Sequence, residues 1–345
     1  MMEHAPVFNP AGNDDVGTRT IWFGNTTNLK QLNDIRYGWA RQLYKQMREQ
    51  FWIPQKLDIT GDVNDYASLT AGERRAFDGI LSYLTFLDSV QTCNIPHLGL
   101  TITAPEVSLC LNEQTSQEAM HNESYQVIID TIVPSDRRSD IYEFWRTDKV
   151  LYDRCKYIAG LYQQYVDNPS QENYFIALVA DYMLEGLYFY NGFAFFYNLA
   201  SSSLMSGCAD IFRLINRDEL SHVRLYQKLL EEARQVFPHS LEQIYEMFDG
   251  AVQQEVLWAS HIIGDSVLGI TEDSTEHYTR YLANTRLKAI GLSPLYSDPK
   301  YKKSPYAHLE RFADVSSEGS TKSNFFEGTV TSYVMSSGVE GWEDF

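Results

Sequence analysis

The chain has 345 residues, of which 44% are hydrophobic and 14% aromatic, enough for a sizeable core. Its 28 basic and 46 acidic residues give a net charge of −18, which repels nucleic acid and anionic membrane surfaces alike. The four cysteines show neither close pairing nor CxxC spacing, so the sequence favours neither a disulfide framework nor a zinc site and predicts a cytoplasmic protein.

Residues 1–28 contain Pro, Gly, Asn and Asp without a sustained period and are expected to form an extended arm. No basic stretch followed by an apolar run occurs there, so no signal peptide is predicted. The sequence from about residue 29 to 291 is patterned almost throughout as helices, and we expect one helical domain over residues 29–313. The apolar stretch 186–200 is shorter than a membrane span and is expected to be a buried core helix.

One helix is expected to begin at Thr70, because the sequence from Thr70 to Glu73 has the form of a capping box. Phe77, Leu81 and Asp88 then share one face of this helix. An aspartate is therefore placed in line with core residues.

The next helix is expected to begin near Pro105, and it carries the pattern Glu118-x-x-His121. A Glu and a His three residues apart lie on the same face of a helix. Tyr125 follows His121 by four residues, so it lies on that face as well. The inward face of this helix is thus partly polar.

A helix pair across residues 138–167 precedes Pro169 and Ser170, which open a segment whose apolar stripe includes Glu185. A Ser-rich break follows at residues 201–203.

The next segment repeats the pattern as Glu219-x-x-His222. Two further amphipathic helices are expected at about 240–265 and 274–290, the second ended by Gly291.

Four acids on core faces, together with two histidines, form the candidate site. A buried carboxylate is costly unless it is paired or binds metal, and no Lys or Arg shares these inward faces. Two divalent cations would balance four carboxylates, and an oxygen-rich ligand set without thiolate favours iron or manganese. A single Glu-x-x-His is usually a solvated helix pair, and Asp88 alone could form a cap or a salt bridge. The combined set predicts a dimetal centre with these ligands: Asp88, Glu118, His121, Glu185, Glu219 and His222.

The spacing also places the Tyr125 ring beside the metals. A buried phenol that only packs and donates one hydrogen bond is the ordinary alternative. Phe189, Phe193 and Ile215, each at helical spacing from a ligand, would enclose the phenol in a dry apolar pocket. Such a pocket favours a radical site at Tyr125.

Over most of its length the sequence resembles the small, radical-generating subunit of class I ribonucleotide reductase. The matching stretches, in order, are Phe51-Trp52-Ile53-Pro54, Leu87-Asp88-Ser89, Glu118-Ala119-Met120-His121 with Tyr125, Leu184-Glu185, Arg217-Asp218-Glu219 through His222, and Ser332-Tyr333.

This resemblance implies that the six ligands hold two metal ions that activate dioxygen and oxidise Tyr125 to a stable tyrosyl radical. Iron is the first expectation, with a dimanganese or manganese–iron pair as alternatives. The radical would pass to a separate catalytic subunit, which reduces ribonucleotides to deoxyribonucleotides, so this chain would be an oxidoreductase subunit that binds no substrate itself.

The resemblance also implies a transfer route through His121, Asp218 and Trp52 in the body of the protein and Tyr333 near its end. Trp52 could instead be a packed indole, and Asp218 could lie on a solvated face. Residues 314–345 are expected to form a flexible tail that docks on the catalytic subunit. An acidic tail that only aids solubility is the alternative, but it would not account for the aromatic residues there.

The sequence therefore predicts an all-α, ferritin-like helical bundle with a dimetal carboxylate centre, forming a homodimer and binding neither nucleic acid nor membrane. Two other functions remain open on the same fold. A dimetal oxygenase would use the same ligands on a bound substrate, and an iron-storage protein would load many metals into a large shell.

Overall fold

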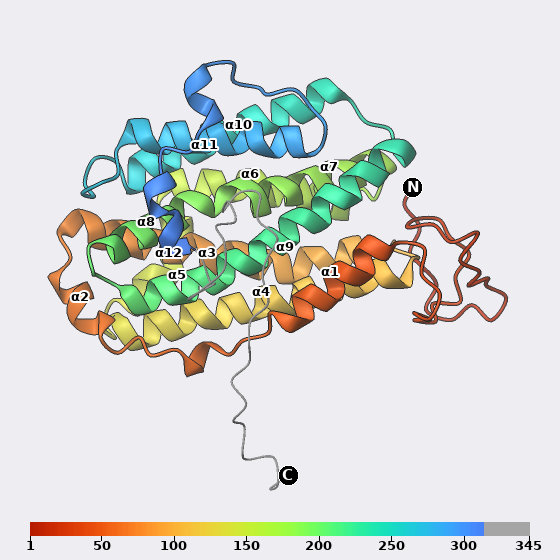
Figure 1. Cartoon of the computed structure of the whole chain (residues 1–345), viewed down its shortest axis with the longest axis horizontal. Helices are drawn as coiled ribbons and strands as arrows, with labels where there is room; N and C mark the ends of the chain where they lie inside the picture. Colours follow the sequence, from red (N-terminus) through yellow and green to blue (C-terminus); the bar gives the residue numbers. More distant parts are fainter. Residues whose placement is uncertain (314–345) are drawn as a thin grey trace, which may run out of the picture.

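Helices α3 (Ala71–Gly99) and α4 (Pro105–Ile132) pack side by side in the computed structural model, which describes residues 1–313 (Figure 1). Helix α9 (Ser206–Val236) packs against α4, and α7 (Gln171–Met183) packs against α9. A π turn (Leu184–Tyr188) and α8 (Tyr190–Ser201) continue α7. These helices carry every candidate metal ligand.

The remaining helices surround this group. They are α1 (Gly38–Glu49), α2 (Asp62–Ser68), α5 (Arg138–Thr147), α6 (Lys149–Asp167), α10 (Leu241–Ile262), α11 (Glu272–Ala289) and α12 (Glu310–Ala313), with single 3-10 turns at Pro54–Lys56, Pro299–Lys302 and Ala307–Leu309. Within residues 1–313 the only β pairing is an isolated bridge between Trp22 and Ile102. The predicted all-α bundle is confirmed.

Local sequence signals set several helix ends as predicted. The Thr70 side chain accepts a bond from the Glu73 backbone N–H while the Glu73 side chain caps Thr70, which completes the capping box. Ser170 caps α7 in a similar way. Gly291 adopts a φ of +76° after α11, a left-handed conformation that glycine reaches without strain.

The first 37 residues form no α-helix, and the first helix begins at Gly38 rather than near residue 29. This segment packs against the helical body. The Trp22 indole donates to the Tyr174 hydroxyl at 2.9 Å, and Arg19 forms a buried ion pair with Glu106 at 3.1 Å.

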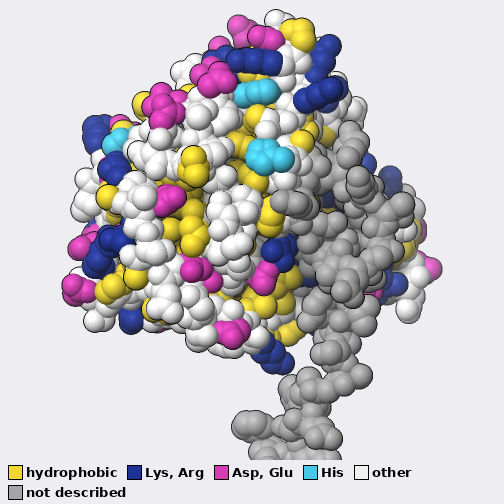
Figure 2. Space-filling view, turned by 60° about the vertical axis from the view of Figure 1, so that its left-hand side comes forward, with side chains coloured by type: hydrophobic (Ala, Val, Ile, Leu, Met, Phe, Trp, Pro, Cys, Tyr) yellow, Lys and Arg dark blue, Asp and Glu magenta, His cyan; other side chains and the backbone are white. Residues whose placement is uncertain are grey.

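The surface and the interior differ sharply in composition. On the face shown in Figure 2, basic and acidic side chains are interspersed, with apolar side chains between them. Inside, every residue from 173 to 200 is buried, in agreement with the predicted core helix. None of the helices in residues 1–313 is long and apolar enough to cross a membrane.

Candidate metal centre

The six predicted ligands converge in the centre of the bundle. Asp88 lies on α3, Glu118 and His121 on α4, Glu185 in the π turn, and Glu219 and His222 on α9. Each of these side chains is 0% exposed. They form two groups in which the potential ligand atoms all lie within 4.8 Å of one another: Asp88, Glu118, His121 and Glu219 in one, and Glu118, Glu185, Glu219 and His222 in the other.

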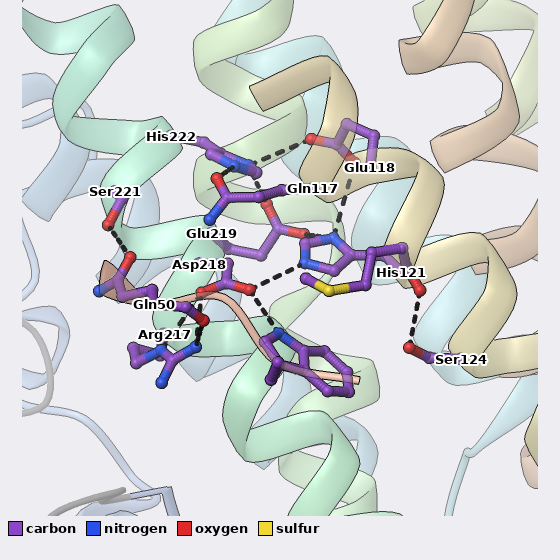
Figure 3. Close-up of polar contacts among 12 residues, drawn as sticks. Gln50, Gln117, Glu118, His121, Ser124, Arg217, Asp218, Glu219, Ser221 and His222 are labelled. Atoms are coloured by element: carbon purple, nitrogen blue, oxygen red, sulfur yellow. Dashed lines mark hydrogen bonds and ion pairs between the residues drawn. The ribbon is translucent and has the colours of Figure 1, made fainter. Parts of the chain in front are cut away.

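Glu118 and Glu219 belong to both groups, and each directs one oxygen to each histidine (Figure 3). Glu118 Oε2 lies 3.7 Å from His121 Nδ1 and its Oε1 lies 3.1 Å from His222 Nδ1. Glu219 Oε1 lies 3.2 Å from His121 Nδ1 and its Oε2 lies 3.0 Å from His222 Nδ1. Glu118 and Glu219 could therefore each be shared between two metal ions.

Seven of the potential ligand atoms have no hydrogen-bond partner. Both carboxylate oxygens of Asp88 and of Glu118, together with Glu185 Oε2, Glu219 Oε1 and His121 Nδ1, are buried without a hydrogen bond. Unpaired buried polar atoms are rare because each costs about 1–3 kcal/mol or more. Their common orientation toward two shared positions fits a pair of divalent cations.

The electrostatics of the cluster favour the same conclusion. Burial, and then the charges of Glu118 and Glu219, raise the pKa of Asp88 well above its usual value. Burial and the same two neighbours, with Glu219 the stronger, raise the pKa of Glu185 well above its usual value. Four ionised carboxylates at this separation need positive charge between them.

Both histidines present Nδ1 to the cluster and Nε2 to a supporting side chain. His121 Nε2 lies 3.4 Å from Asp218 Oδ2, and His222 Nε2 lies 3.0 Å from Gln117 Oε1. Such partners orient ligating histidines and fix which nitrogen carries the proton.

Asp218 extends this support to the surface side of the bundle. Its Oδ2 accepts a hydrogen bond of 2.8 Å from the Trp52 indole, and its Oδ1 accepts bonds of 3.2 and 3.1 Å from Arg217. Trp52 is 6% exposed. The structure thus brings the three predicted body residues of the transfer route, His121, Asp218 and Trp52, into one chain of contacts.

Glu185 is held by residues to which the sequence reasoning assigned no role. Its Oε1 accepts bonds from Gln91 at 2.7 Å and from Gln114 at 2.9 Å. Gln91 also donates to Asp181 at 2.6 Å. Gln91, Gln114 and Asp181 each lie three or four positions from a predicted ligand in the sequence. This helical spacing is the sequence signal that could have identified them as supports of the site.

Tyr125 lies in the interior at 1% exposure. Burial, and then the charge of Asp88, raise the pKa of its phenol well above the usual value. Its ring stacks against Phe212 with centroids 6.1 Å apart, and Phe212 in turn contacts Phe193. The predicted pocket residues, Phe189, Phe193 and Ile215, are all buried. The remaining predicted site residue, Tyr333, lies outside the described residues.

Comparison with known proteins gives a consistent result. A family model described as ribonucleotide reductase, small chain, matches residues 29–305. The ribonucleoside-diphosphate reductase subunit beta of Treponema pallidum is 37% identical over 344 residues, with 98% of this chain and 97% of that protein covered. The corresponding subunit of Halalkalibacterium halodurans is 34% identical over 326 residues, with 93% of each covered. The solved structure of the ribonucleotide reductase R2 subunit from Clostridium botulinum is 41% identical, with a TM-score of 0.87, and the match covers 91% of this chain and 99% of that one.

Proposed function

This chain belongs to the family of ribonucleotide reductase small chains, and on that premise we propose that it generates a tyrosyl radical at Tyr125 for use by a separate catalytic subunit. The observation that carries the proposal is the convergence of six buried ligand side chains on two shared positions, with Tyr125 buried on the helix that carries Glu118 and His121. The dry aromatic surroundings of the phenol support it, because a radical survives longer where water and other reactants are excluded.

Two metal ions would be held by Asp88 and His121 on one side, Glu185 and His222 on the other, and Glu118 and Glu219 between them. A bound metal pair would supply the chemistry that activates dioxygen and removes one electron and one proton from the Tyr125 phenol. We propose a di-iron centre, with dimanganese or manganese–iron as the alternatives, because carboxylate oxygens and imidazole suit both elements.

The protein's own residues would then connect the centre to the partner. The contacts from His121 through Asp218 to the Trp52 indole form a continuous path of 3.4 and 2.8 Å steps. Trp52 borders a surface groove that Phe51 and Ile53 also line, and Phe51 is 58% exposed. We propose that the oxidising equivalent leaves the chain along this path.

The catalytic subunit is the proposed partner, and residues 314–345 are the proposed docking segment, with Tyr333 as the last transfer residue of this chain. We further propose that the chain acts as a homodimer. The protein would be an oxidoreductase only in the assembled enzyme, because it holds the radical while the partner binds the ribonucleotide.

Replacing Tyr125 with Phe tests the radical assignment. The variant keeps every metal ligand, so two metals per chain should still bind, while the organic radical signal in electron paramagnetic resonance should disappear after exposure to oxygen. Tyr226→Phe is a matched control. Tyr226 follows His222 by four residues, as Tyr125 follows His121, and it is equally buried.

The control should keep the signal at the wild-type yield per metal. An unchanged radical in Tyr125→Phe would refute the assignment, as would its loss in Tyr226→Phe alone. A metal count of zero in wild-type protein loaded with iron or manganese would remove the basis of the proposal altogether.

A further inference from the structure

The helix that carries Glu185 is widened by the π turn (Leu184–Tyr188) within a stretch where every residue from 173 to 200 is buried. A π turn shifts the register of the backbone hydrogen bonds, and such turns often occur at functional sites. Carbonyl groups in a buried segment need donors from the protein, because water cannot reach them. Two carbonyl groups in this turn receive donors from the side chains of other helices.

Arg286 on α11 supplies the first donor. Its Nε donates to the Gly186 carbonyl at 3.1 Å, and its guanidinium lies 5.1 Å from the centre of the Tyr190 ring. The side chain is buried, and it forms no ion pair with any residue in the described range 1–313. A Cβ atom at position 186 would lie 3.0 Å from Arg286 Nε, so the glycine leaves room for this contact.

Arg154 on α6 supplies the second donor. Its Nη2 donates to the Tyr188 carbonyl at 2.6 Å and to Glu255 at 2.5 Å. The same carbonyl accepts a bond of 3.2 Å from the Tyr83 hydroxyl. The guanidinium lies 4.2 to 4.6 Å from the centres of the Tyr83, Tyr188 and Trp258 rings.

The pairing with Glu255 explains how this charge is tolerated. Both side chains are 0% exposed, and an arginine at that depth requires a carboxylate and well-placed acceptors. Neither arginine contacts a candidate metal ligand through its side chain in any hydrogen bond or ion pair of the described residues. Their shared target is the backbone of the turn.

We propose that Arg154 and Arg286 are positioning residues of the metal centre, which hold the π turn in place and thereby aim Glu185 at its ion. This inference rests on the proposed dimetal function. Relaxation of the turn to a regular α-helix would remove one residue from the register and rotate one flanking segment by about 100° relative to the other. The Glu185 carboxylate could not then face His222 while α8 kept its packing.

Arg286 gives the cleaner test, since removal of Arg154 would leave Glu255 buried without a counter-charge. Arg286→Met keeps most of the side-chain volume and loses the donor to the Gly186 carbonyl. Arg286→Lys keeps the charge but has no donor at the Nε position. Arg280→Met is the control, because Arg280 lies on the same helix with its guanidinium 5.0 Å from the Tyr296 ring and does not contact the turn.

The measurement is an anaerobic titration of metal-free protein with Mn²⁺, followed by electron paramagnetic resonance and fitted to two binding constants. The variant Glu185→Gln identifies which of the two Mn²⁺ binding constants belongs to the ion that Glu185 binds. Both Arg286 variants should weaken that constant by about 10–100-fold, the usual effect of losing support around a ligand. The other constant should stay within about twofold, and Arg280→Met should leave both unchanged.

Equal weakening of both constants, or wild-type constants in Arg286→Met, would overturn the inference. If the Met variant fails to fold, Gly186→Ala replaces it, because its Cβ would push the guanidinium off the carbonyl. Two bound ions in the wild type with no effect of either variant would refute the positioning role alone. Fewer than two ions in the wild type would refute the dimetal proposal and this inference together.

Discussion

One oxygen of Asp218 faces two donor groups at once. Trp52 Nε1 donates to Oδ2 at 2.8 Å, His121 Nε2 lies 3.4 Å from the same atom, and Arg217 occupies Oδ1. All of these neighbours approach with N–H groups or a ring nitrogen. A carboxylate fits here because it offers two acceptor oxygens and no donor.

Asp218→Asn should therefore separate radical formation from radical use. The amide NH₂ must face either Arg217 or the pair formed by Trp52 and His121, so one contact is lost. We expect the tyrosyl radical to form with near wild-type yield per metal while turnover with the catalytic subunit falls by about 10–100-fold. Radical yield and deoxyribonucleotide formation are measured on the same preparation.

Asp210→Asn is the control, since Asp210 lies on the same helix and pairs with Arg213 at the partly exposed surface. It should change neither quantity. Full turnover in Asp218→Asn would show that the Trp52 contact plays no part in transfer.

The metal ligands could be predicted from the sequence more readily than the side chains that hydrogen-bond to them. Glu-x-x-His occurs twice and places acids and imidazoles on inward faces, so the six ligands could be picked out from spacing and charge alone. Gln91, Gln114 and Gln117 carry no charge, and a buried amide can satisfy many different acceptors. Their roles became visible only when Glu185 and His222 were placed beside them.

At the scale of elements, the π turn was the feature that the pattern could not show. The apolar stripe from Leu178 through Glu185 to Phe196 reads as one regular helix, and periodicity does not detect a single extra residue in a segment buried on all sides. The turn depends on donors from α3, α6 and α11, which are distant in the sequence. The helix ends at Thr70, Ser170 and Gly291 were predictable because their signals are local.

Gly192, just after the π turn, should be intolerant of a larger side chain. A Cβ there would lie 2.8 Å from the hydroxyl of Tyr83, which donates to the Tyr188 carbonyl. Gly192→Ala is expected to lower the free energy of unfolding by about 1–3 kcal/mol through overpacking.

Gly160→Ala provides the contrast, because Gly160 is an exposed glycine in α6 with nothing within 4 Å of the added Cβ. That change should raise the free energy of unfolding by about 0.4–1 kcal/mol. Urea unfolding gives the free energy of unfolding of both variants. An equal change in the two variants would contradict the close approach of Tyr83 to Gly192.

Asp181 couples three helices and should make stability depend on pH. Burial raises its pKa to about 7, although hydrogen bonds from Gln91 and Tyr162 favour the ionised form. The folded protein therefore keeps a proton that the unfolded chain, with a pKa of 3.8, has released. Because the folded-state pKa is the higher one, this contribution to stability is complete below about pH 4 and is lost as pH rises to about 7.

Asp181→Asn removes that ionisation. Between pH 5 and pH 7 the metal-free variant should gain stability relative to metal-free wild type by about 1.4 kcal/mol per pH unit, the value for one proton. Urea unfolding at several pH values tests this, and a constant difference across the range would show that the pKa of Asp181 is not raised.

For the whole molecule, metal should act as a structural component as well as a reagent. The centre joins α3, α4, α9 and the π turn, and metal bound only by the folded state stabilises that state. An ion at 100 times its dissociation constant contributes about 2.7 kcal/mol, so the Tm of wild-type protein should rise by about 5 °C or more on loading.

Glu118→Gln should abolish most of this rise, because Glu118 belongs to both ligand groups. Differential scanning calorimetry of metal-free and loaded protein gives both values. An equal rise in the variant would mean that the metals bind elsewhere.

The overall class of the molecule was predictable because helical periodicity extends over most of the chain. The path of the first 37 residues was not, since single contacts such as that of Trp22 with Tyr174 join positions far apart in the sequence. The homodimer and the docking tail stay predictions.

Asp88 and Glu185, at the two ends of the ligand cluster, differ in the number of carboxylate oxygens that are free to bind a cation. Neither oxygen of Asp88 accepts a hydrogen bond, whereas Glu185 Oε1 accepts bonds from two amides and only its Oε2 accepts none. Glu185 would therefore offer a bound ion one free oxygen, whereas Asp88 would offer two. In metal-loaded protein, small exogenous molecules such as azide or nitric oxide should therefore bind on the Glu185 side of the centre in preference to the Asp88 side.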